Sequence, residues 1–515
     1  MKSKSRFGLP SFADIFFLLP FLFLSLDGGN QLLNDAGTGF HIRAGEYILS
    51  KMAVPRYDVF SHIAPPLPWF AHEWLSEILM ALIHRNFGLT GVVLFFGFLI
   101  ACTYFFFFKF IRSFSDNTVF PFLVGLLACI SSALHWLARP HTFTIALTLI
   151  WYAVLESHRS KNKHYLFVLP LTMLLWVNLH GGFVVGFLLL AFYLSGYAVE
   201  ALFASEPQNN LSRQKFRSLL YTTLACLIIA LLNPAGYQVL FFPFKLALNP
   251  SLVDIIMEYR SPNFHQALPF KYLLLLTIAT LAVSRAAANP IELLLVLAFT
   301  YMALYSERHI PLFAIIIAPI LVRRIDLMMS SREGIITRWF IRRFRNLAAI
   351  DGQLSGHFWP IAALLLVGVM AGVGLIRFAF DPAKMPIAAV EFLKHEKIQG
   401  NMYNPEQFGD YVIYAAWPQY RVFVDGRIDM YGPETMSNYM KVAALQPGWR
   451  DVLTKYGINF IFDHANSPLS FFLKEHGDWR LVYSDRVANI FVRDSAENGP
   501  LIGKYPDVKL ALNAP

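Results

Sequence analysis

Long apolar segments separated by short polar loops constrain this chain more than any other feature. The mean hydropathy of +0.48 indicates that much of the chain is surrounded by lipid. Because about 20 helical residues span the hydrocarbon core of a bilayer, we predict a polytopic α-helical membrane protein with about eleven transmembrane helices. The predicted spans are 11–30, 89–111, 118–137, 141–157, 164–180, 182–203, 216–233, 269–285, 290–305, 309–323 and 357–376.

Two segments fall outside this simple pattern. Residues 73–83 are apolar but short, so they are predicted to form a helix in the membrane interface or, alternatively, a short twelfth span. Near the N-terminus, Met1–Arg6 and the apolar stretch Phe16–Leu26 have the layout of a signal peptide without a small-residue cleavage site. Because many spans follow, this stretch is predicted to remain as the first helix.

The positions of the basic residues predict the orientation. With the N-terminus in the cytoplasm, the loops on that side carry most of the basic surplus of the membrane region, as the positive-inside rule requires. The net charge of +9 then sets topology and indicates no nucleic-acid partner. These loops contain Lys109 and Arg112, Arg213–Arg217, Arg285 and the run Arg323–Arg345.

The composition changes beyond about residue 378, where short strand-like and helical runs alternate and predict a small α/β domain. With eleven spans this domain lies outside the cytoplasm. We therefore predict a transmembrane domain over 1–378, which includes a first outer loop at 31–88, and a C-terminal extracytoplasmic domain over 379–515. The predicted strands are Tyr411–Tyr414, Arg421–Val424, Phe460–Phe462, Leu481–Tyr483 and Ile490–Val492, and the predicted helices are Pro433–Leu445, Trp449–Lys455 and Pro468–His476.

Ionisable residues of mixed sign collect at the outer ends of the spans, and such groups near lipid usually mark function. Asp35 follows the first span and precedes a helix expected from about Gly39, so its carboxylate could act as a general base or as a metal ligand. The alternative is a salt-bridged interfacial helix that only anchors the loop. The outer clusters contain Asp35, His41, Arg43, His72, Glu73, Arg139, His141, His180, Arg260, Arg308 and His309.

The same residues predict no metal site. The carboxylates of the first outer loop include no adjacent pair, and the separations of His72, His141 and His180 match no short zinc motif.

Several short motifs together resemble the GT-C class of integral-membrane glycosyltransferases, and in particular a bacterial branch of that class. They are "D.GTGFHIRAGEYIL…P..DVFS", "W..HEWLSE", "RPH.F", "W.NLHGGF", "NP.G" and "FGDY…VFVDGRIDMYG", and they extend over nearly the whole chain. The resemblance implies a GT-C-like fold in a bacterial inner membrane with a periplasmic C-terminal domain. It also implies a hexosyl or pentosyl transferase that takes its sugar from a polyprenyl phosphate and passes it to a glycan, lipid or protein acceptor.

The resemblance also implies roles for particular residues. Asp35 takes the position of the catalytic carboxylate, and departure of an anionic polyprenyl phosphate requires compensating positive charge. Some members of the class use a divalent cation and others do not, so a cation requirement stays open. The implied phosphate-binding residues are Arg308, Arg260, Arg139, His141 and His309, with His41, Arg43, His72, Glu73 and His180 in support, and Asp410, Asp425 and Arg427 on the acceptor side.

Simpler interpretations stand beside these roles. Each outer arginine could instead reach from a helix end to lipid headgroups. Asp425 could cap a turn while Arg427 pairs with Asp429. For the whole chain, the alternatives are a transporter or flippase for lipid-linked glycans and a non-catalytic assembly protein. A transporter should carry ionisable groups near the middle of its spans.

Overall fold

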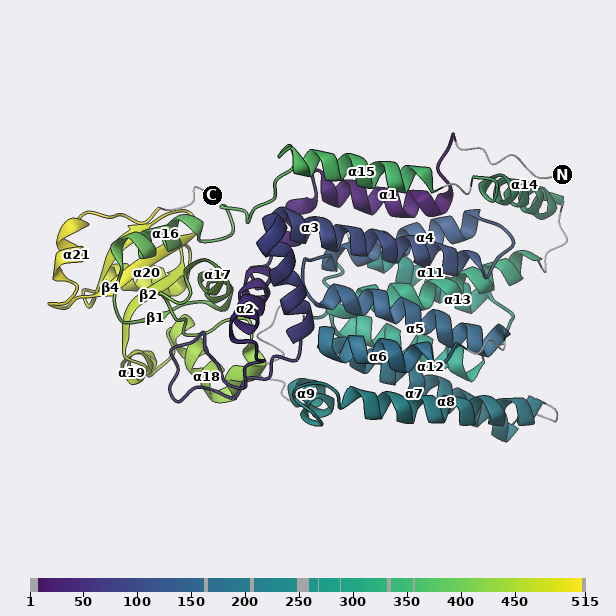
Figure 1. The fold of residues 1–515 in the computed structure, drawn as a ribbon, viewed down its shortest axis with the longest axis horizontal. Coiled ribbons are helices and arrows are strands. Elements are labelled where there is room, and N and C mark those ends of the chain that lie inside the picture. Colours follow the sequence, from purple (N-terminus) through teal and green to yellow (C-terminus); the bar gives the residue numbers. More distant parts are fainter. Residues whose placement is uncertain are drawn as a thin grey trace. The chain divides into compact units, whose positions relative to one another are not determined.

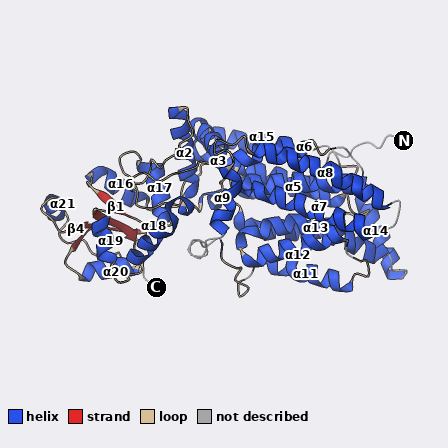
Figure 2. Cartoon of the chain, turned by 90° about the horizontal axis from the view of Figure 1, so that it is seen from below, coloured by secondary structure: helices blue, strands red, loops and turns tan. Residues whose placement is uncertain are grey.

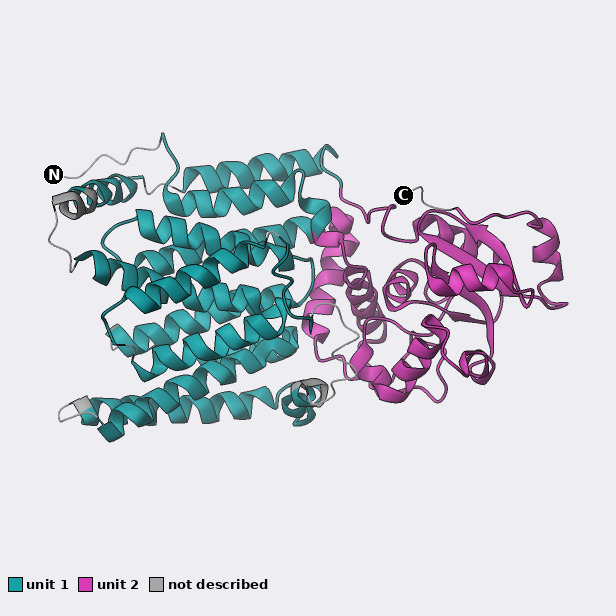
Figure 3. Ribbon diagram, turned by 180° about the vertical axis from the view of Figure 1, so that it is seen from behind, with its two compact units in different colours: residues 1–31, 93–245, 256–377 teal, residues 32–92, 246–255, 378–515 magenta. Residues whose placement is uncertain are grey.

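The computed structural model describes residues 8–161, 165–203, 208–247, 259–266, 268–287, 289–330, 335–354 and 357–511. The chain forms two compact units, shown separately coloured in Figure 3. Unit 1 comprises residues 1–31, 93–245 and 256–377, and unit 2 comprises residues 32–92, 246–255 and 378–515. This grouping differs from the predicted domains, because most of the first outer loop belongs with the C-terminal region.

Unit 1 is a bundle of helices, drawn as coiled ribbons in Figure 1. Each predicted span overlaps one of the observed helices. Short 3₁₀ turns, η2 (Ala133–His135), η3 (Gly181–Phe183) and η5 (Glu307–His309), connect some of them. The helices lying wholly or mainly in unit 1 are α1 (Phe12–Ser25), α3 (Trp74–Arg112) from residue 93, α4 (Val119–Ser132), α5 (His141–Lys161), α6 (Val168–Leu179), α7 (Val184–Phe203), α8 (Gln208–Ala230), α9 (Gln238–Ala247), α11 (Pro269–Val283), α12 (Pro290–Tyr305), α13 (Ile310–Ser330), α14 (Ile335–Asp351) and α15 (Phe358–Gly372).

Length and composition identify fewer candidate spans than the sequence pattern does. In the described part of the chain, two helical segments are long and apolar enough to cross a membrane, Trp74–Arg112 and Gly181–Phe203. Shorter apolar helices include Phe12–Ser25, Pro290–Tyr305 and Phe358–Gly372. The helices themselves are therefore confirmed, and the number of membrane crossings stays a prediction.

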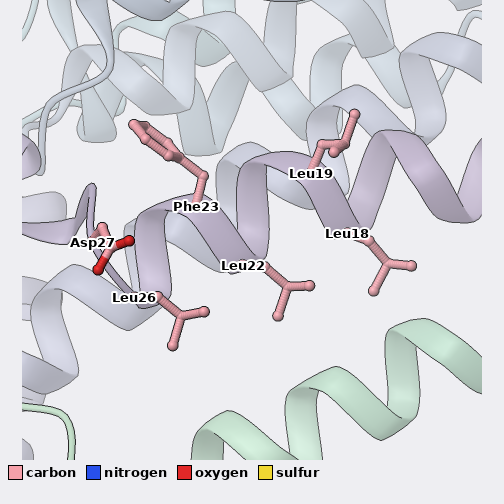
Figure 4. Close-up of a pocket in the computed structure, with 6 residues that line it drawn as sticks. All are labelled: Leu18, Leu19, Leu22, Phe23, Leu26 and Asp27. Carbon is pink, nitrogen blue, oxygen red and sulfur yellow. The ribbon is translucent and has the colours of Figure 1, made fainter.

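Helix α13 forms the centre of unit 1. Its residues Ile310–Val322 are all buried, and a helix that is apolar on every side needs neighbours all round. It packs against α4, α5, α11 and α12. By contrast, α1 keeps an apolar groove along one face, where Leu18, Leu22 and Leu26 point away from the axis (Figure 4).

A glycine divides α3 (Trp74–Arg112) into two helical parts. Gly88 has φ 62° and ψ −164°, a backbone conformation that is essentially restricted to glycine. The helix before the break corresponds to the predicted interfacial helix at 73–83, and the helix after it corresponds to the predicted span at 89–111. The glycine thus fixes the boundary that the sequence pattern indicated.

Substitution of Gly88 with alanine should destabilise the protein by about 1–3 kcal/mol, because the backbone conformation is strained for any residue with a Cβ. No atom lies within 4 Å of the added Cβ, so the loss would come from backbone strain alone. Gly368→Ala in α15 is the matched control, since its Cβ also meets nothing and its φ is not positive. Thermal unfolding of the full chain in detergent measures both, and equal melting temperatures for the two variants would contradict this explanation.

Unit 2 contains a four-stranded sheet, shown in red in Figure 2. Its strand order is β1-β2-β4-β3, with β1 parallel to β2 and the other neighbours antiparallel. Phe460, Ile461 and Phe462 of β2 pair with Val492, Phe491 and Ile490 of β4, and all six are buried. The strands are β1 (Asn401–Tyr403), β2 (Ile458–His464), β3 (Trp479–Ser484) and β4 (Ala488–Arg493).

Helices α16, α19, α20 and α21 pack against the strands of this sheet, and unit 2 also contains the helices of the first outer loop. A mostly helical chain with a small C-terminal sheet confirms the coarse fold prediction. Three predicted helices are confirmed as α18, α19 and α20. The helices of unit 2 are α2 (Gly37–Lys51), the first part of α3, α16 (Ile387–Glu396), α17 (Glu406–Ala416), α18 (Ile428–Ala443), α19 (Trp449–Lys455), α20 (Pro468–Glu475) and α21 (Gly499–Lys504), and the short η1 (Gly29–Leu33) precedes α2.

Two predicted strands are wrong. Tyr411–Tyr414 lies within α17, which buries Phe408, Val412 and Ile413 and packs against α2. Arg421–Val424 is extended but lies outside the sheet. It forms one parallel bridge, Ser61↔Val422, in which the amides of His62 and Val422 donate to the carbonyls of Val422 and Phe60. The backbone partner of Arg421–Val424 is therefore the first outer loop, whereas the sequence pattern predicted a neighbouring strand of the sheet.

Candidate functional site

Asp35 lies in unit 2, immediately before α2. One carboxylate oxygen accepts a hydrogen bond from the backbone amide of Gly37 at 2.6 Å, and the backbone amide of Thr38 donates to the carbonyl of Asp35 at 3.3 Å. Asp35 thus stabilises the first turn of α2, where amides would otherwise lack partners. Its side chain is half-buried.

A chain of imidazoles and carboxylates connects α2 to the start of α3 in unit 2. His41 Nδ1 lies 3.4 Å from Glu77 Oε1, and His41 Nε2 lies 3.8 Å from Glu73 Oε2. The other oxygen of Glu73 lies 3.5 Å from His72 Nε2. Burial alone would lower the pKa of His72, but the Glu73 carboxylate outweighs burial and raises the pKa to about 9. Three residues predicted to support the site, His41, His72 and Glu73, therefore form one network.

Arg43, another predicted supporting residue, connects α2 to α17. Its guanidinium donates to Glu46 Oε2 and to the backbone carbonyl of Tyr414, each at 2.5 Å. A hydrogen bond from His84, together with the Arg43 charge, lowers the pKa of Glu46. This arrangement is that of a structural ion pair at a helix–helix contact.

Arg427 is the centre of a buried ion network in unit 2. It donates to both oxygens of Asp425, at 2.8 and 2.6 Å, and to Asp58 Oδ1 at 2.8 Å. The rings of Phe40, Phe60 and Trp69 surround the guanidinium, with centroids 5.1, 5.3 and 4.6 Å from its carbon. All six residues belong to unit 2.

Electrostatics explain how this charge network tolerates burial. Desolvation by itself would raise the pKa of Asp58, but the positive charge of Arg427 and the hydroxyl of Ser61 outweigh it and lower the pKa. Desolvation likewise opposes the charge on Arg427, and Asp425 reverses the effect and raises its pKa well above the ordinary value. Asp58 and Arg427 are therefore both ionised.

This geometry bears on the three residues predicted for the acceptor side. Asp425 does cap a turn, by accepting from the Arg427 amide at 3.0 Å. Arg427 pairs with Asp425 and Asp58, where the alternative interpretation paired it with Asp429. Asp410 is buried in α17 and accepts from the Gly426 amide at 3.0 Å. As placed, Asp410, Asp425 and Arg427 hold unit 2 together, and an acceptor-binding role for them stays a prediction.

In unit 1, polar residues meet where α6, α12 and α4 end and where α7, α13 and α5 begin. Arg308 in η5 donates to the hydroxyl of Tyr259 at 2.7 Å, and its Nη2 lies 3.4 Å from His180 Nε2. His180 follows α6 and contacts Thr144 of α5, whose hydroxyl accepts from the Trp176 indole at 2.9 Å. Three connections between helices thus converge on His180 and Arg308.

Two of the remaining predicted phosphate-binding residues of unit 1, Arg139 and His309, lie in these connections, His141 is the first residue of α5, and Arg260 lies in the segment before α11. His141 begins α5, and its ring centroid is 6.4 Å from that of His180. Arg139 is half-buried in the turn before α5, and Arg260 is exposed while its carbonyl accepts from the Glu307 amide at 3.0 Å. His309 follows Arg308 in η5 and bonds the carbonyl of Met302 at 3.1 Å.

Some contributors escaped the sequence analysis. Glu77 lies one helical turn after Glu73, so the i, i+4 spacing could have placed both carboxylates beside His41. Asp58 is a carboxylate of the first outer loop, and nothing in the sequence indicates Arg427 as its partner. Tyr259 and Thr144 carry no sequence signal of their partnership with Arg308 and His180.

Within the described ranges, no group of three or more His, Cys, Asp or Glu side chains could hold a metal ion. That part of the chain therefore offers no ligand set that fits the divalent cation implied for some GT-C members.

Comparison with protein-family models and with curated proteins gave no match. Among solved structures, the chain is similar to the archaeal oligosaccharyltransferase AglB from Archaeoglobus fulgidus in complex with an inhibitory peptide and a dolichol-phosphate. The TM-score is 0.55 at 10% identity, over 88% of this chain and 69% of that chain. The apo form of the Archaeoglobus fulgidus oligosaccharyltransferase gives a TM-score of 0.56 at 11% identity, over 94% of this chain and 74% of that chain. This likeness shows that the chain shares the fold of these two structures.

Proposed function

We propose that this chain is an integral-membrane glycosyltransferase that moves a sugar from a polyprenyl-phosphate carrier to an envelope glycan, lipid or protein acceptor. The reaction takes place on the outer face of a bacterial inner membrane. The observation that carries the proposal is the fold likeness to AglB, which extends over 88% of this chain and includes a structure with bound dolichol-phosphate, itself a polyprenyl phosphate.

The unit 1 cluster supplies chemistry that suits such a donor. Departure of polyprenyl phosphate leaves negative charge on phosphate oxygens, and a guanidinium in a partly desolvated site stabilises that charge. Arg308 is half-buried and held by Tyr259, so its orientation is set before a donor binds. Arg260 is exposed and has less to contribute. We therefore assign the donor phosphate to Arg308 first.

Asp35 is assigned the role of general base. Its carboxylate takes the proton of the acceptor nucleophile while the nucleophile attacks the anomeric carbon. The bond between the anomeric carbon and the phosphate oxygen breaks, and polyprenyl phosphate leaves with the electron pair. Attack opposite the leaving group inverts the anomeric configuration. The proton and the sugar are thus both accounted for without a further reactant.

Product analysis tests this function against the transporter alternative. The purified full chain, reconstituted in liposomes, would be given polyprenyl-phosphate sugars together with a membrane extract as the source of acceptor. We expect free polyprenyl phosphate and a glycosylated product with inverted configuration. Intact donor moved across the bilayer, without cleavage of the sugar–phosphate bond, would refute the transferase and support a flippase. Glycan analysis of a deletion strain would identify the sugar that is missing from the envelope when the transferase is absent.

Arg308→Gln should weaken donor binding about tenfold or more while acceptor binding changes little, because a hydrogen-bonded charge to the phosphate is lost. Arg285→Gln is the matched control, since Arg285 is an exposed arginine of unit 1 predicted to face the cytoplasm. Binding of a polyprenyl-phosphate sugar to the two detergent-solubilised variants measures the effect. Unchanged donor affinity in Arg308→Gln would remove Arg308 from the proposed site.

A further inference from the structure

Helix α14 (Ile335–Asp351) alternates arginines with aromatic and aliphatic residues. Its sequence, "IITRWFIRRFRNLAAID", contains four arginines and one aspartate. The run Arg323–Arg345 is predicted to set the orientation of the chain, and that role requires only positive charge on the cytoplasmic side. Positive charge alone does not account for the large apolar residues between the arginines. The side-chain positions on α14 indicate a further role.

Two contacts place α14 at one end of unit 1. The backbone amide of Phe12, the first residue of α1, donates to Asp351 Oδ1 at 2.7 Å. The rings of Phe344 and Phe120 have centroids 5.5 Å apart, and Phe120 lies in the first turn of α4. Figure 1 shows α14 at the end of the bundle where α1 begins. Because the predicted orientation puts the starts of α1 and α4 on the cytoplasmic side, we expect α14 at the cytoplasmic surface of the membrane.

Helix α14 packs through one apolar face and exposes another. Successive residues of a helix are rotated by about 100°, so Phe344 and Ala348 share a face. Ala348 is buried there, next to the ring contact of Phe344 with α4. Leu347 and Ile350 lie on an adjoining face and are 43% and 48% exposed. Apolar side chains on an exposed face beside a packed one are typical of a helix that lies in the membrane interface.

Three exposed arginines accompany these apolar residues. Arg342 and Arg345 lie on the third face of α14. Arg345 Nη2 lies 3.9 Å from a carboxylate oxygen of Asp116, but the two side chains are 61% and 87% exposed, so this ion pair is weak. The guanidinium carbon of Arg343 lies 5.5 Å from the ring centroid of Trp339. An arginine that follows an aromatic ring in this way can keep its charged end at the level of lipid headgroups.

The charges and the exposed apolar residues fit one kind of partner. Apolar residues that enter the bilayer surface bring neighbouring guanidinium groups to the level of the lipid phosphates, and the planar guanidinium matches phosphate oxygens. We propose that α14 lies in the cytoplasmic interface of the membrane and binds anionic phospholipid headgroups through Arg342, Arg343 and Arg345. An anionic lipid is selected over a zwitterionic one because only the anionic headgroup carries net negative charge.

The position of α14 favours lipid over other acidic partners. RNA would match the arginines, but it offers no apolar surface to Leu347 and Ile350. The bilayer offers both, and it surrounds α14 if α1 and α4 are the spans that the sequence predicts. This binding requires the predicted orientation of the chain and is independent of sugar transfer.

Substitution of the three arginines tests headgroup binding. The full chain in detergent would be titrated with phosphatidylglycerol or phosphatidylcholine, and bound lipid would be counted by native mass spectrometry. Because each basic residue near an anionic lipid contributes, Arg342→Gln, Arg343→Gln and Arg345→Gln together should weaken phosphatidylglycerol binding about tenfold or more. Binding of phosphatidylcholine should hardly change. Unchanged affinity for phosphatidylglycerol would overturn the proposal.

The matched control removes the same charge from other parts of unit 1. Arg213, Arg217 and Arg285 are exposed arginines that are also predicted to face the cytoplasm. With all three changed to glutamine, affinity for phosphatidylglycerol should stay within about threefold of the unmodified protein, because these arginines lie outside α14. Equal weakening in the two triple variants would show a diffuse attraction to positive charge and overturn the assignment to α14.

A second measurement leaves the arginines unchanged. The fluorescence of Trp339 would be obtained as the difference between the full chain and Trp339→Phe, both reconstituted in liposomes. Lipid brominated near the headgroup should quench this fluorescence about twofold more than lipid brominated at the chain end, because an interfacial helix lies near the headgroups. Brominated phosphatidylglycerol should quench more than brominated phosphatidylcholine. Absence of quenching would overturn the interfacial placement, and equal quenching by the two lipids would overturn the selection of anionic headgroups.

Two further results separate this proposal from its alternatives. Binding of an RNA oligonucleotide that depends on the three arginines, with phosphatidylglycerol affinity unchanged, would assign α14 to nucleic acid and overturn the lipid assignment. Loss of phosphatidylglycerol binding in the α14 triple variant, with sugar transfer unchanged, would support the lipid site and leave the transferase proposal intact.

Discussion

Replacement of Asp35 with asparagine should reduce sugar transfer by about 10²- to 10⁴-fold, the range for loss of a general base. Asparagine cannot take a proton from the acceptor. It keeps the side-chain oxygen that accepts from the Gly37 amide, so the first turn of α2 should stay intact. Expression and thermal unfolding are therefore expected to match those of the unmodified protein.

Asp27→Asn is the control for this experiment. Asp27 is an exposed aspartate just after α1, and the same one-atom change there should leave transfer within twofold. Turnover of a polyprenyl-phosphate sugar by the purified variants measures both. Near-normal turnover in Asp35→Asn would exclude Asp35 as the general base, and its role would then be to stabilise the first turn of α2. Equal loss in both variants would point to a general effect of charge removal.

The periodic apolar segments predict most helices of unit 1, whereas α9 and α14 match none of the predicted spans. Each predicted span overlaps a helix because runs such as Ile310–Val322 have no other way to satisfy their backbone groups away from water. Spacing and composition also predicted α19, whose observed bounds, Trp449–Lys455, are those expected. These features are local, so the sequence contains them directly.

Features that depend on distant contacts were not predictable in the same way. The stretch Tyr411–Tyr414 is rich in residues that favour strands, yet it is helical because α17 packs on α2. Close contacts between segments distant in the sequence explain why two positions within the motifs are glycine. A Cβ at Gly39 would lie 2.7 Å from the side chain of Tyr414, and a Cβ at Gly409 would lie 2.0 Å from the carbonyl of Val424.

These packing roles change how the motifs are interpreted. The motifs "GTGFHIRAGEYIL" and "FGDY" have the residue types of a functional site. Contacts within unit 2 nevertheless account for Gly39, Arg43 and Gly409. Arg427 is accounted for in the same way, by Asp58 and Asp425. A single sequence does not distinguish a charge that binds substrate from a charge that is buried with its partner, because both stand out equally in an apolar chain.

The buried ion network gives the largest expected effect on stability. Arg427→Met should destabilise the protein by about 3–5 kcal/mol, because Asp425 and Asp58 would be left buried without a compensating charge. The unfolding temperature of the full chain in detergent measures the loss. Arg450→Met is the matched control: Arg450 also has a carboxylate partner, Asp478 at 3.6 Å, and lies over Trp449, but its side chain is 54% exposed.

Because Arg450 is exposed, Arg450→Met should change the free energy of unfolding very little, since exposed ion pairs contribute about 0–1 kcal/mol. A triple variant, Arg427→Met with Asp425→Asn and Asp58→Asn, tests the cause. If uncompensated charge is responsible, removal of both carboxylate charges should recover part of the stability lost in Arg427→Met. If instead the loss comes from missing contacts with Phe40, Phe60 and Trp69, the triple variant should be no more stable than the single one. Methionine keeps much of the apolar contact with these rings, which makes recovery the expected result.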